Sequence, residues 1–582
     1  MPQIVQQGSL NTTALIVPDL YVQIVPPQNL LLNGVPTNTL GVVGTAQWGP
    51  VGQAMIVGSS AQYASIFGAI QNRKYDMGTQ VATAVQQGAS NFRCVRVTDG
   101  TDTAASAVIL STCLTLTALY TGTLGNSLTA TVSAGSKLGT LRAVIGIPGL
   151  TPEVYDNIPG SVTAWAVTTA YVVGQVVSNG VNFYTCVTAG TSAGSGGPSG
   201  TTNGITGGTV TWNFLSTVNA FWVALAAAIN AGNGILRGPS NLVTATAGAG
   251  TTAPAAATYT LSGGTDGVSS IVVANLVGVD TTPRKGMYAL RGQGCSIGLL
   301  ADADTSSTWT AQASFGLSEG IYMICTAPAG AAIQNGTTGT VDLKQQAGLD
   351  SYAVKLLHGD WVYWNDPVNL VTRLVSPQGF AAGRLANLSP EQSSLNKQLY
   401  GVIGSQKAGL QASQNTTYAG AELQLLIQNG VDVICNPQPG GAYWGLRAGH
   451  NSSSNPATNG DNYTRMTNYI ASTVAAGMGI YVGRTVNATL FSQIRSTLLN
   501  FFSNLVSAGQ LALQNGALPF SVVCDSTNNP SNMTGLGYVT ANCQVQYQAI
   551  NEKFIVNLEG GQTVSVLKQS STVSNVPSTP VL

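Results

Sequence analysis

The stretch that decides the fold class is residues 40–68, LGVVGTAQWGPVGQAMIVGSSAQYASIFG. Its start, Leu40–Gly44, is a short apolar run typical of a buried strand, and the Gly-Pro pair that follows predicts a turn. Ala54–Val57 predicts a second strand. A helix over Ser60–Phe67 comes next, capped by one of the two serines at its start. Strand, turn, strand and helix in this order predict an α/β domain.

The same α/β pattern occupies two separated parts of the chain, 36–112 and 278–345. The first part is completed by a helix over Met77–Gln87 and a strand over Phe92–Val97. The second part predicts a strand, a helix and a further strand, over Ser296–Ala301, Ala311–Glu319 and Ile321–Thr326. The interval between the two parts therefore indicates an insertion.

The interval 113–277 is rich in Gly, Thr, Ser and Ala and predicts a β-rich inserted domain. Within it, residues 161–215 carry aromatic residues on short strands around a Gly/Ser loop, which indicates a second, nested module. The strand before this module stops at Pro159, and a helix over Asn219–Ile229 resumes after it. Such an insertion is tolerated where the two ends of a module meet at a surface loop.

Residues 346–560 predict a C-terminal domain with two long helices, Asp461–Ala476 and Ala488–Leu513, whose apolar residues recur at helical spacing. Strands are predicted over Ser521–Cys524, Ala541–Tyr547 and Lys553–Leu558. Residues 1–35 and 561–582 alternate apolar and polar residues, which predicts extended arms. The expected fold class is α+β multidomain, with α/β core domains, a β-rich inserted outer domain and strand-forming arms at both ends.

The charge balance excludes some classes of function. Lys and Arg number 22, Asp and Glu also number 22, and charged residues make up only 8% of the chain, against roughly 25% in an ordinary soluble protein. A neutral chain has little long-range self-repulsion and tends to associate. No run of basic residues occurs, which argues against a nucleic-acid partner.

The eight cysteines are scattered without a C-x-x-C pair, so we expect neither a zinc site nor a disulfide framework. The first residues lack the charged and apolar regions of a secretory signal, and no apolar run is long enough to span a bilayer. We therefore expect the protein to be made and kept in a reducing cytoplasm.

Two short patterns look superficially catalytic. Gly294–Gly298 matches G-x-S-x-G, but the nucleophile elbow needs a strand before its serine, whereas the apolar run here follows it. Asp302 and Asp304 follow a predicted strand and are more typical of loop caps than of aspartyl-phosphate chemistry. The chain has only His358 and His450 as histidine bases and no Walker motif. We expect no catalytic residue, no metal site, no cofactor and no enzyme activity.

Further motifs are spread along the chain. The N-terminal half contains VPDLYVQIVPP (17–27) and AVQQGASNFRCVRV (84–97), and the middle contains TGTLGNSL (121–128) and LSGGTDG (261–267). Three more specific motifs lie towards the C-terminus: NGVDVICNPQPGGAYWGLRAGHNSS (429–453), DNYTRMTNYIASTVAAGMGIYVGRTVNATLFSQIRSTLLNFFSNLVSAGQL (461–511) and FSVVCDSTNNPSNMTGLGYVTANCQVQYQAINEKFIVNLEG (520–560). By their order, spacing and coverage, the chain resembles the contractile tail sheath family, apart from the nested module.

The resemblance implies a structural subunit that assembles as stacked hexameric rings around a tail tube and contracts to drive the tube through the host envelope. It also implies that the C-terminal domain faces the tube, that inserted domains point outward, and that both arms add strands to neighbouring subunits. The implied partners are further copies of the chain, the tail tube protein, the baseplate and the tail terminator. The implied location is a virion tail assembled in the host cytoplasm.

Two sets of residues are candidates for these contacts. The candidate inter-subunit arm strands contain Tyr21, Val22, Ile24, Val25, Thr563, Val564, Val566 and Leu567. The candidate tube-facing residues are Gln493, Arg495 and Ser496 on the predicted helix over Ala488–Leu513. An equally open alternative for this helix is a core helix with one solvated arginine, because an apolar stripe only indicates packing.

The nested module is similar to small carbohydrate-binding-type modules over AWAVTTAYVVGQVVSNGVNFYTCVTAGTS (164–192) and GGTVTWNFL (207–215). The similarity implies rings stacked on sugars, with Trp165, Tyr171, Tyr184 and Trp212 as candidate glycan-facing aromatics. Chitin-binding relatives carry exposed tryptophans after the second tyrosine, and here Cys186 and its neighbours replace them. We favour a decorative outer domain whose aromatics form its core; weak glycan binding by the module is the alternative.

Two other assignments stay open at this stage. One is the sheath of a non-viral contractile injection system, whose subunits share the fold. The other, from a different class, is a glycan-binding adhesin or tail-fibre protein, favoured by the nested module and the Gly/Thr richness. The long helical region from residue 461 to residue 513 argues against the second assignment.

Overall fold

The computed structural model describes residues 3–5, 21–23, 32–110, 112–137, 140–159, 163–234, 237–410, 418–513, 516–558, 560 and 562. The chain forms two compact units, Met1–Gln548 and Ala549–Leu582. The second unit therefore begins inside the predicted 346–560 domain and not at residue 561. No helix in the described ranges is long and apolar enough to cross a membrane.

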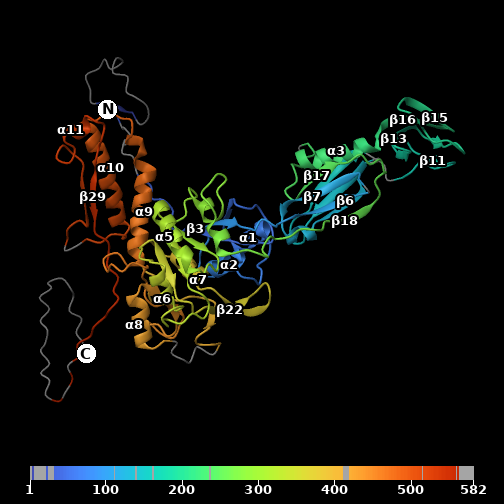
Figure 1. Cartoon of the computed structure of the whole chain (residues 1–582). Helices are drawn as coiled ribbons and strands as arrows, with labels where there is room; N and C mark the ends of the chain where they lie inside the picture. The colour runs from blue at the N-terminus through green and yellow to red at the C-terminus, as the bar shows by residue number, and fades with distance from the viewer. Residues whose placement is uncertain are drawn as a thin grey trace, which may run out of the picture. The chain divides into compact units, whose positions relative to one another are not determined.

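The first unit is organised around a seven-stranded sheet with strand order β25-β21-β20-β19-β3-β5-β4. All neighbouring strands are parallel except β4, which pairs antiparallel with β5. Strands from the blue and the yellow-green parts of the chain thus lie side by side (Figure 1). The strands are β3 (Leu40–Gly44), β4 (Ala54–Val57), β5 (Phe92–Arg96), β19 (Ile297–Leu300), β20 (Tyr322–Thr326), β21 (Val354–Leu357) and β25 (Val431–Asp432).

Both faces of this sheet are covered by helices, as its continuous apolar strands require. Val42 belongs to one buried core and its neighbour Val43 to the other, because successive side chains of a strand point to opposite faces. The first core is closed by α1 (Ser60–Phe67), α2 (Met77–Gln86) and α7 (Gln378–Ala386). The second core is closed by α4 (Val273–Val277), α5 (Trp309–Glu319), α6 (Thr340–Gln346) and α8 (Gly420–Gln428).

The sheet corrects the predicted domain boundary between residues 345 and 346. Its strands β21 and β25 come from the region predicted as the C-terminal domain, yet they continue the parallel ladder from β20. Parallel neighbours are joined by long crossover connections, so local sequence does not reveal which strands share a sheet. A smaller antiparallel sheet, β23-β22-β24, packs against the first core and consists of β22 (Val362–Asp366), β23 (Val371–Val375) and β24 (Val402–Ser405).

The insertion between β5 and β19 has its own core, formed by two sheets and one helix. The first sheet contains β6 (Ala104–Ile109), β7 (Leu114–Thr121) and β17 (Val243–Ala247). The second sheet contains β8 (Thr129–Ala134), β9 (Thr140–Gly146), β10 (Glu153–Pro159) and β18 (Ala257–Thr260), and α3 (Val218–Ala231) covers the core. Because β6 pairs with β7, the insertion starts before the predicted residue 113.

The nested module is a small β structure with a separate aromatic core. It contains β11 (Ala170–Tyr171), β12 (Val176–Asn179), β13 (Asn182–Thr188), β14 (Gly190–Thr191), β15 (Asn203–Gly207) and β16 (Val210–Thr217). The strand β16 runs directly into α3, and Thr217 caps that helix by accepting from the Ala220 amide. The predicted helix over Asn219–Ile229 is thus confirmed, with slightly longer bounds.

The remainder of the first unit is a helical module built on α9 (Asp461–Met478) and α10 (Ala488–Ser507). Two antiparallel strands, β28 (Phe520–Val523) and β29 (Asn542–Val545), pack on α10, and the short helix α11 (Ser531–Thr534) joins them. The helix α10 ends before the predicted Leu513 because Gly509, with a φ of 73°, terminates it. Single turns and short strands complete the described part: η2 (Thr123–Ser127), η3 (Gly286–Leu290), η4 (Ser306–Thr308), η6 (Gly479–Tyr481), β26 (Ile434–Cys435) and β27 (Gly445–Leu446).

Near the N-terminus, β1 (Gln3–Val5) pairs in parallel with β2 (Tyr21–Gln23). The predicted arm residues Tyr21 and Val22 thus lie in a strand, whereas Ile24 and Val25 lie outside the described residues. The predicted C-terminal arm residues Thr563, Val564, Val566 and Leu567 also lie outside them.

Candidate functional site: assembly surfaces

A buried charge cluster joins the helical module to the central sheet. The ammonium of Lys355 on β21 lies 2.6 Å from the Asp432 carboxylate and 3.1 Å from that of Asp461, and none of the three side chains is exposed. Asp432 ends β25, and Asp461 is the first residue of α9. The hydroxyl of Tyr322 donates to Asp461 at 2.6 Å, and Ser394 donates to its other oxygen.

Electrostatic interactions favour the ionised forms of Lys355 and Asp461 despite their burial. Burial raises the pKa of Asp461, but the Lys355 ammonium and the Ser394 and Tyr322 hydroxyls more than offset it, so its pKa lies below the usual range. Burial lowers the pKa of Lys355, and the Asp432 and Asp461 carboxylates reverse this and raise it. Removing one partner from such a cluster leaves an unpaired buried charge. The cluster therefore fixes the start of α9 against the sheet.

Arg465, one turn further along α9, adds a second connection. Its guanidinium donates to the backbone carbonyls of Leu388 and Ser389, at 2.6 and 2.9 Å. Burial lowers its pKa to about 10, so the side chain remains charged at neutral pH. With Lys355, it balances the charges of Asp432 and Asp461, which makes the buried network neutral.

One face of α9 also holds the last residues of the predicted N-terminal arm. Leu32 is only 7% exposed in the core of the helical module, and the space beside it exists because Gly477 has no side chain. A Cβ atom built on Gly477 would lie 2.0 Å from a Leu32 methyl carbon. The amide of Val35 donates to the Thr473 hydroxyl at 3.2 Å. The arm is thus anchored along α9 on its way to β3.

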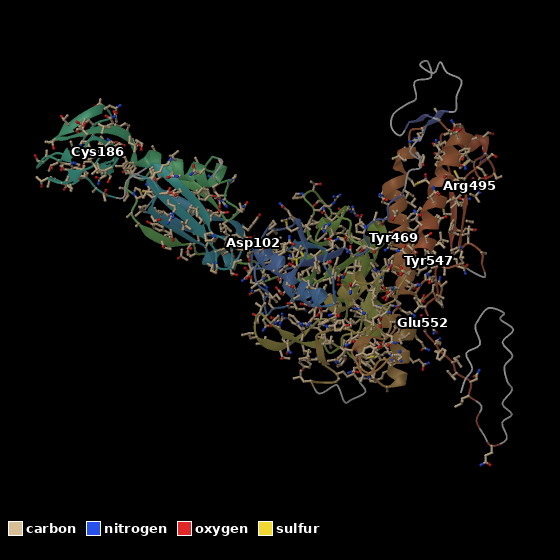
Figure 2. The ribbon with its side chains drawn as sticks, turned by 180° about the vertical axis from the view of Figure 1, so that it is seen from behind. Asp102, Cys186, Tyr469, Arg495, Tyr547 and Glu552 are labelled. Carbon is tan, nitrogen blue, oxygen red and sulfur yellow. The ribbon has the colours of Figure 1, made fainter. Side chains whose placement is uncertain are left out.

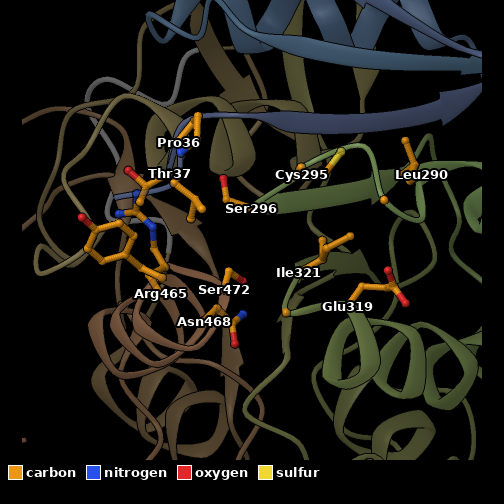
Figure 3. A pocket seen from close by; sticks show the side chains of 15 residues that line it. Pro36, Thr37, Leu290, Cys295, Ser296, Glu319, Ile321, Arg465, Asn468 and Ser472 are labelled. Atoms are coloured by element: carbon orange, nitrogen blue, oxygen red, sulfur yellow. The ribbon is translucent and has the colours of Figure 1, made fainter. Parts of the chain in front are cut away.

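A cavity of about 340 Å³ lies between this anchored segment, the start of β19 and α9. Figure 3 shows Ser296, Arg465 and Glu319 at its wall. Ser296 donates to the Thr39 carbonyl at 3.1 Å, and Glu319 is paired with Arg291 at 2.9 Å. No histidine is among the described residues that line the cavity. The serine of the G-x-S-x-G match therefore has no histidine beside it in this cavity, and Glu319 is already engaged by Arg291.

The two aspartates considered at sequence level have structural partners. Asp302 accepts from the Tyr75 amide at 3.0 Å and from the Gln80 side chain at 2.9 Å, and Asp304 pairs with Lys74 at 2.8 Å. Both aspartates therefore hold the loop after β19 against the segment that leads into α2. Among the residues that the structure describes, no group of His, Cys, Asp and Glu could hold a metal ion.

The predicted tube-facing residues lie near the start of α10. Gln493 and Arg495 are exposed, and Ser496 is half-buried, whereas the apolar positions of the helix face the module core. Arg484 donates to the Gln493 side chain at 3.2 Å. Figure 2 shows Arg495 on the same helical module as Tyr469 and Tyr547. The position leaves Arg495 free to contact a partner, and the tube contact stays a prediction.

The β28–β29 ladder is a sheet of two strands only, so within the described residues each strand has an outer edge without a strand neighbour. Unpaired edges of this kind are where an additional strand binds.

In the second unit, the predicted strand over Lys553–Leu558 does not form, and these residues pair with no strand in the part of the chain that the structure describes. Its apolar side chains are instead strongly exposed: Phe554 83%, Ile555 79%, Val556 67% and Leu558 91%.

The aromatics of the nested module are mostly interior residues. Tyr171, Tyr184 and Trp212 are at most 4% exposed and form the module core, and Trp165 is half-buried beside them. The Tyr171 and Trp212 rings meet edge to face, with centroids 4.9 Å apart. Three of the four candidate glycan-facing rings therefore present no face to a ligand. The candidate set came from the similarity to carbohydrate-binding-type modules, and a similarity in sequence does not show which face of each strand is covered.

Sequence reasoning missed the buried charge cluster. Lys355 and Asp461 are 106 residues apart in the chain, and Asp461 lies in a polar stretch, between Gly460 and Asn462, that gives no sign of burial. The only available signal was a lysine inside the otherwise apolar run VKLL, where an unpaired charge would be costly.

No family model and no curated protein matches the chain. A sheath tail protein from Desulfitobacterium hafniense is similar in structure, with a TM-score of 0.52 and 12% identity over 86% of this chain and 93% of that one. A sheath tail protein from Listeria innocua is similar with a TM-score of 0.52 and 13% identity, over 85% of this chain and 90% of that one. The predicted α+β multidomain class and the predicted resemblance are confirmed at the level of the fold: the chain has the fold of these sheath tail proteins.

Proposed function

We propose that the chain is the structural subunit of a contractile tail sheath, and not an enzyme. Copies assemble as stacked hexameric rings around a tail tube, and their rearrangement drives the tube through the host envelope. The partners are other copies of the chain, the tail tube protein, the baseplate and the tail terminator, in a virion tail assembled in the host cytoplasm. The likeness of the fold to sheath tail proteins supports this class of function.

The observation that carries the proposal is the exposed apolar segment Lys553–Leu558 together with the open edges of β28 and β29. A contiguous stretch with side chains 67–91% exposed is unusual in a protein that works alone. Strand addition to a neighbouring copy would bury it and would satisfy the backbone groups of both partners. The neutral net charge favours such association.

A head-to-tail contact that does not close produces a helical array of subunits. In the proposed mechanism the extended array is metastable, is held by a kinetic barrier, and relaxes when the baseplate triggers it. Each subunit would turn largely as a rigid body, with the strand-exchange segments as hinges. No nucleotide would be consumed.

The test is electron microscopy of the purified full-length chain, with and without a proline in the exposed segment. Val556→Pro removes a backbone N–H that an added strand needs, at a residue that is 67% exposed in the single chain. We expect striated tubes or rings from the wild type and from the matched control Val556→Thr, and none from Val556→Pro. A sample lacking residues 1–27 tests the N-terminal arm in the same way.

A chain that stays monomeric at every salt and protein concentration would refute the proposal and would favour the adhesin assignment. Glycan-array binding would then be the next measurement, although the buried rings of the nested module weigh against it. Tubes that form without any phage component would leave open the choice between a phage tail and a non-viral contractile injection system.

A further inference from the structure

The hairpin between β22 and β23 ends in an apolar tip. Leu370 at this tip is 86% exposed, and its neighbours Val368 and Val371 are 49% and 41% exposed. Residues 367–372 carry no charged side chain. A leucine this exposed is neither part of the first core nor hidden by any described residue.

The backbone of Leu370 is also unusual, because its φ angle is +54°. This left-handed conformation suits Gly or Asn, and a branched apolar side chain makes it unfavourable. A strained conformation persists only where the surroundings enforce it, and such outliers gather at functional positions. The position thus combines two features that folding alone disfavours, exposure of a leucine and backbone strain.

The surroundings of the tip enforce this conformation. Asp366, which is 2% exposed, accepts from the Val368 and Asn369 amides at 2.9 and 3.0 Å. Its second oxygen accepts from the Asn369 side chain at 2.8 Å and from Arg373 at 2.9 Å. The Asn369 side chain also donates to the Ile70 carbonyl at 3.2 Å, which ties the hairpin to the chain near α1. The tip is therefore held in one shape before any partner arrives.

We propose that the Val368–Leu370–Val371 tip is a preformed contact knob that docks on a second copy of this chain. The proposal rests on the sheath function and adds a contact outside the strand-exchange segments. Val368 itself lines a cavity of about 100 Å³ together with Tyr63 and Val81, so this side chain lies against its own chain while Leu370 points away from the first core.

Two observations select a second copy as the occupant. Three side chains cover far less than the roughly 1,200 Å² that a stable, isolated complex buries, so the contact is useful only where an ordered array repeats it. The uncharged tip also matches an uncharged partner surface, and a chain in which only 8% of the residues are charged offers such surfaces.

The first experiment compares stability and assembly in Leu370→Asn. Asn accepts the left-handed conformation, so we expect the isolated full-length chain to melt at the same temperature as the wild type or higher. We expect the concentration needed for assembly to rise about tenfold, the factor expected for one lost buried leucine. The matched control is Val173→Asn, at a residue of the nested module that is 61% exposed, and it should assemble as the wild type does.

An unchanged or higher melting temperature of Leu370→Asn together with weaker assembly supports the proposed contact knob. Normal assembly of Leu370→Asn overturns it, and so does a lower melting temperature, because Leu370 would then stabilise its own chain. A wild type that never assembles rejects the sheath function itself, which separates the two failures.

The second experiment identifies the partner directly. A photo-reactive benzoylphenylalanine in place of Leu370, in the full-length chain expressed alone, should give cross-linked pairs of chains in assembled samples and none in monomeric ones. Peptide mapping that finds only cross-links within one chain would overturn the proposal.

Discussion

The nested module and the segment Lys553–Leu558 look alike in sequence, since both carry large apolar residues on short predicted strands, but they differ in the structure. In the module, Tyr184 and Trp212 are fully buried in a core of their own. In the segment, Phe554 and Leu558 are 83% and 91% exposed, and no strand forms. The module is complete within one chain, whereas the segment lacks the partner that would complete it.

Under the proposed function, this difference separates residues that fold the chain from residues that would assemble it. A residue of a completed region is expected to affect the free energy of unfolding and not the assembly. A residue of an incomplete region is expected to affect the assembly and not the free energy of unfolding. The hairpin tip at Leu370 belongs with the second class, although a rigid turn presents it.

The largest effect is expected inside the completed module. Trp212→Ala removes a fully buried indole that packs on Tyr171, and it should lower the module's free energy of unfolding by about 3–5 kcal/mol. Hydrogen exchange over residues 163–217 measures this. Tubes should still form, and their loss would show that the module takes part in the lattice.

The buried charge cluster at the start of α9 should be nearly as sensitive to substitution. Asp461→Asn leaves the buried Lys355 with one carboxylate partner, and we expect a loss of about 3 kcal/mol in unfolding free energy. The control Asp280→Asn removes two surface ion pairs, to Arg284 and Arg291, each of which is worth at most about 1 kcal/mol. Chemical denaturation measures the free energy of unfolding of both variants. Equal losses in the two variants would contradict a special role for the buried charge cluster.

The same charge cluster predicts that the protein loses stability at low pH. The folded pKa of Asp461 lies below its unfolded value, so its contribution to stability is present above about pH 4. The contribution is lost as the pH falls through the folded pKa. The wild type should therefore lose its stability advantage over Asp461→Asn in acid, as denaturation at a series of pH values would reveal. A constant difference down to pH 2 would contradict this.

A smaller effect is expected where the completed region meets the arm. Gly477→Ala places a methyl group against Leu32, and overpacking of this kind costs about 1–3 kcal/mol. The control Gly479→Ala meets no atom within 4 Å and should be neutral. Hydrogen exchange at residues 32–35 reports release of the arm, and identical protection in both variants would disprove the anchor.

The smallest effect on folding is expected in the incomplete segment. Phe554→Ala should change the unfolding free energy by less than about 0.5 kcal/mol, because the ring is 83% exposed. It should nevertheless reduce the assembled fraction in sedimentation. A Phe554→Ala chain that is stable but assembles poorly would be the opposite of Trp212→Ala, which should be less stable but still assemble. Normal sedimentation of Phe554→Ala would contradict a role of this segment in assembly.

Sequence reasoning located the elements whose signals are local. The strands Leu40–Gly44 and Ala54–Val57 and the helix Ser60–Phe67 have the predicted bounds, since apolar runs, a Gly-Pro turn and a serine cap all lie within a few residues. Features that depend on distant pairing were not predictable. The parallel ladder from β20 to β21 and β25 crosses the predicted domain boundary between residues 345 and 346. The charged partners of Lys355 come from elements that are distant in the sequence.

The candidate site residues divide in the same way. Exposure of Gln493 and Arg495 follows from their place opposite the apolar stripe of one helix. The interior position of Tyr171 and Trp212 depends on which sheet face is closed, and alternation does not contain that information. Asp366, Pro367 and Asn369 are turn residues that the sequence does show. The left-handed position itself holds a leucine and no Gly or Asn, so the strain at Leu370 was not predictable.

The passage from β16 into α3 has a consequence for how the particle would look. Thr217 is both the last residue of the strand and the cap of the helix, and the Phe183 ring meets the Phe221 ring with centroids 6.2 Å apart. On this side the nested module therefore has no linker about which to swing. In an averaged image it should yield sharp density, and a fluorescent tag fused to its Gly/Ser loop would sit at a constant height and angle along the tail.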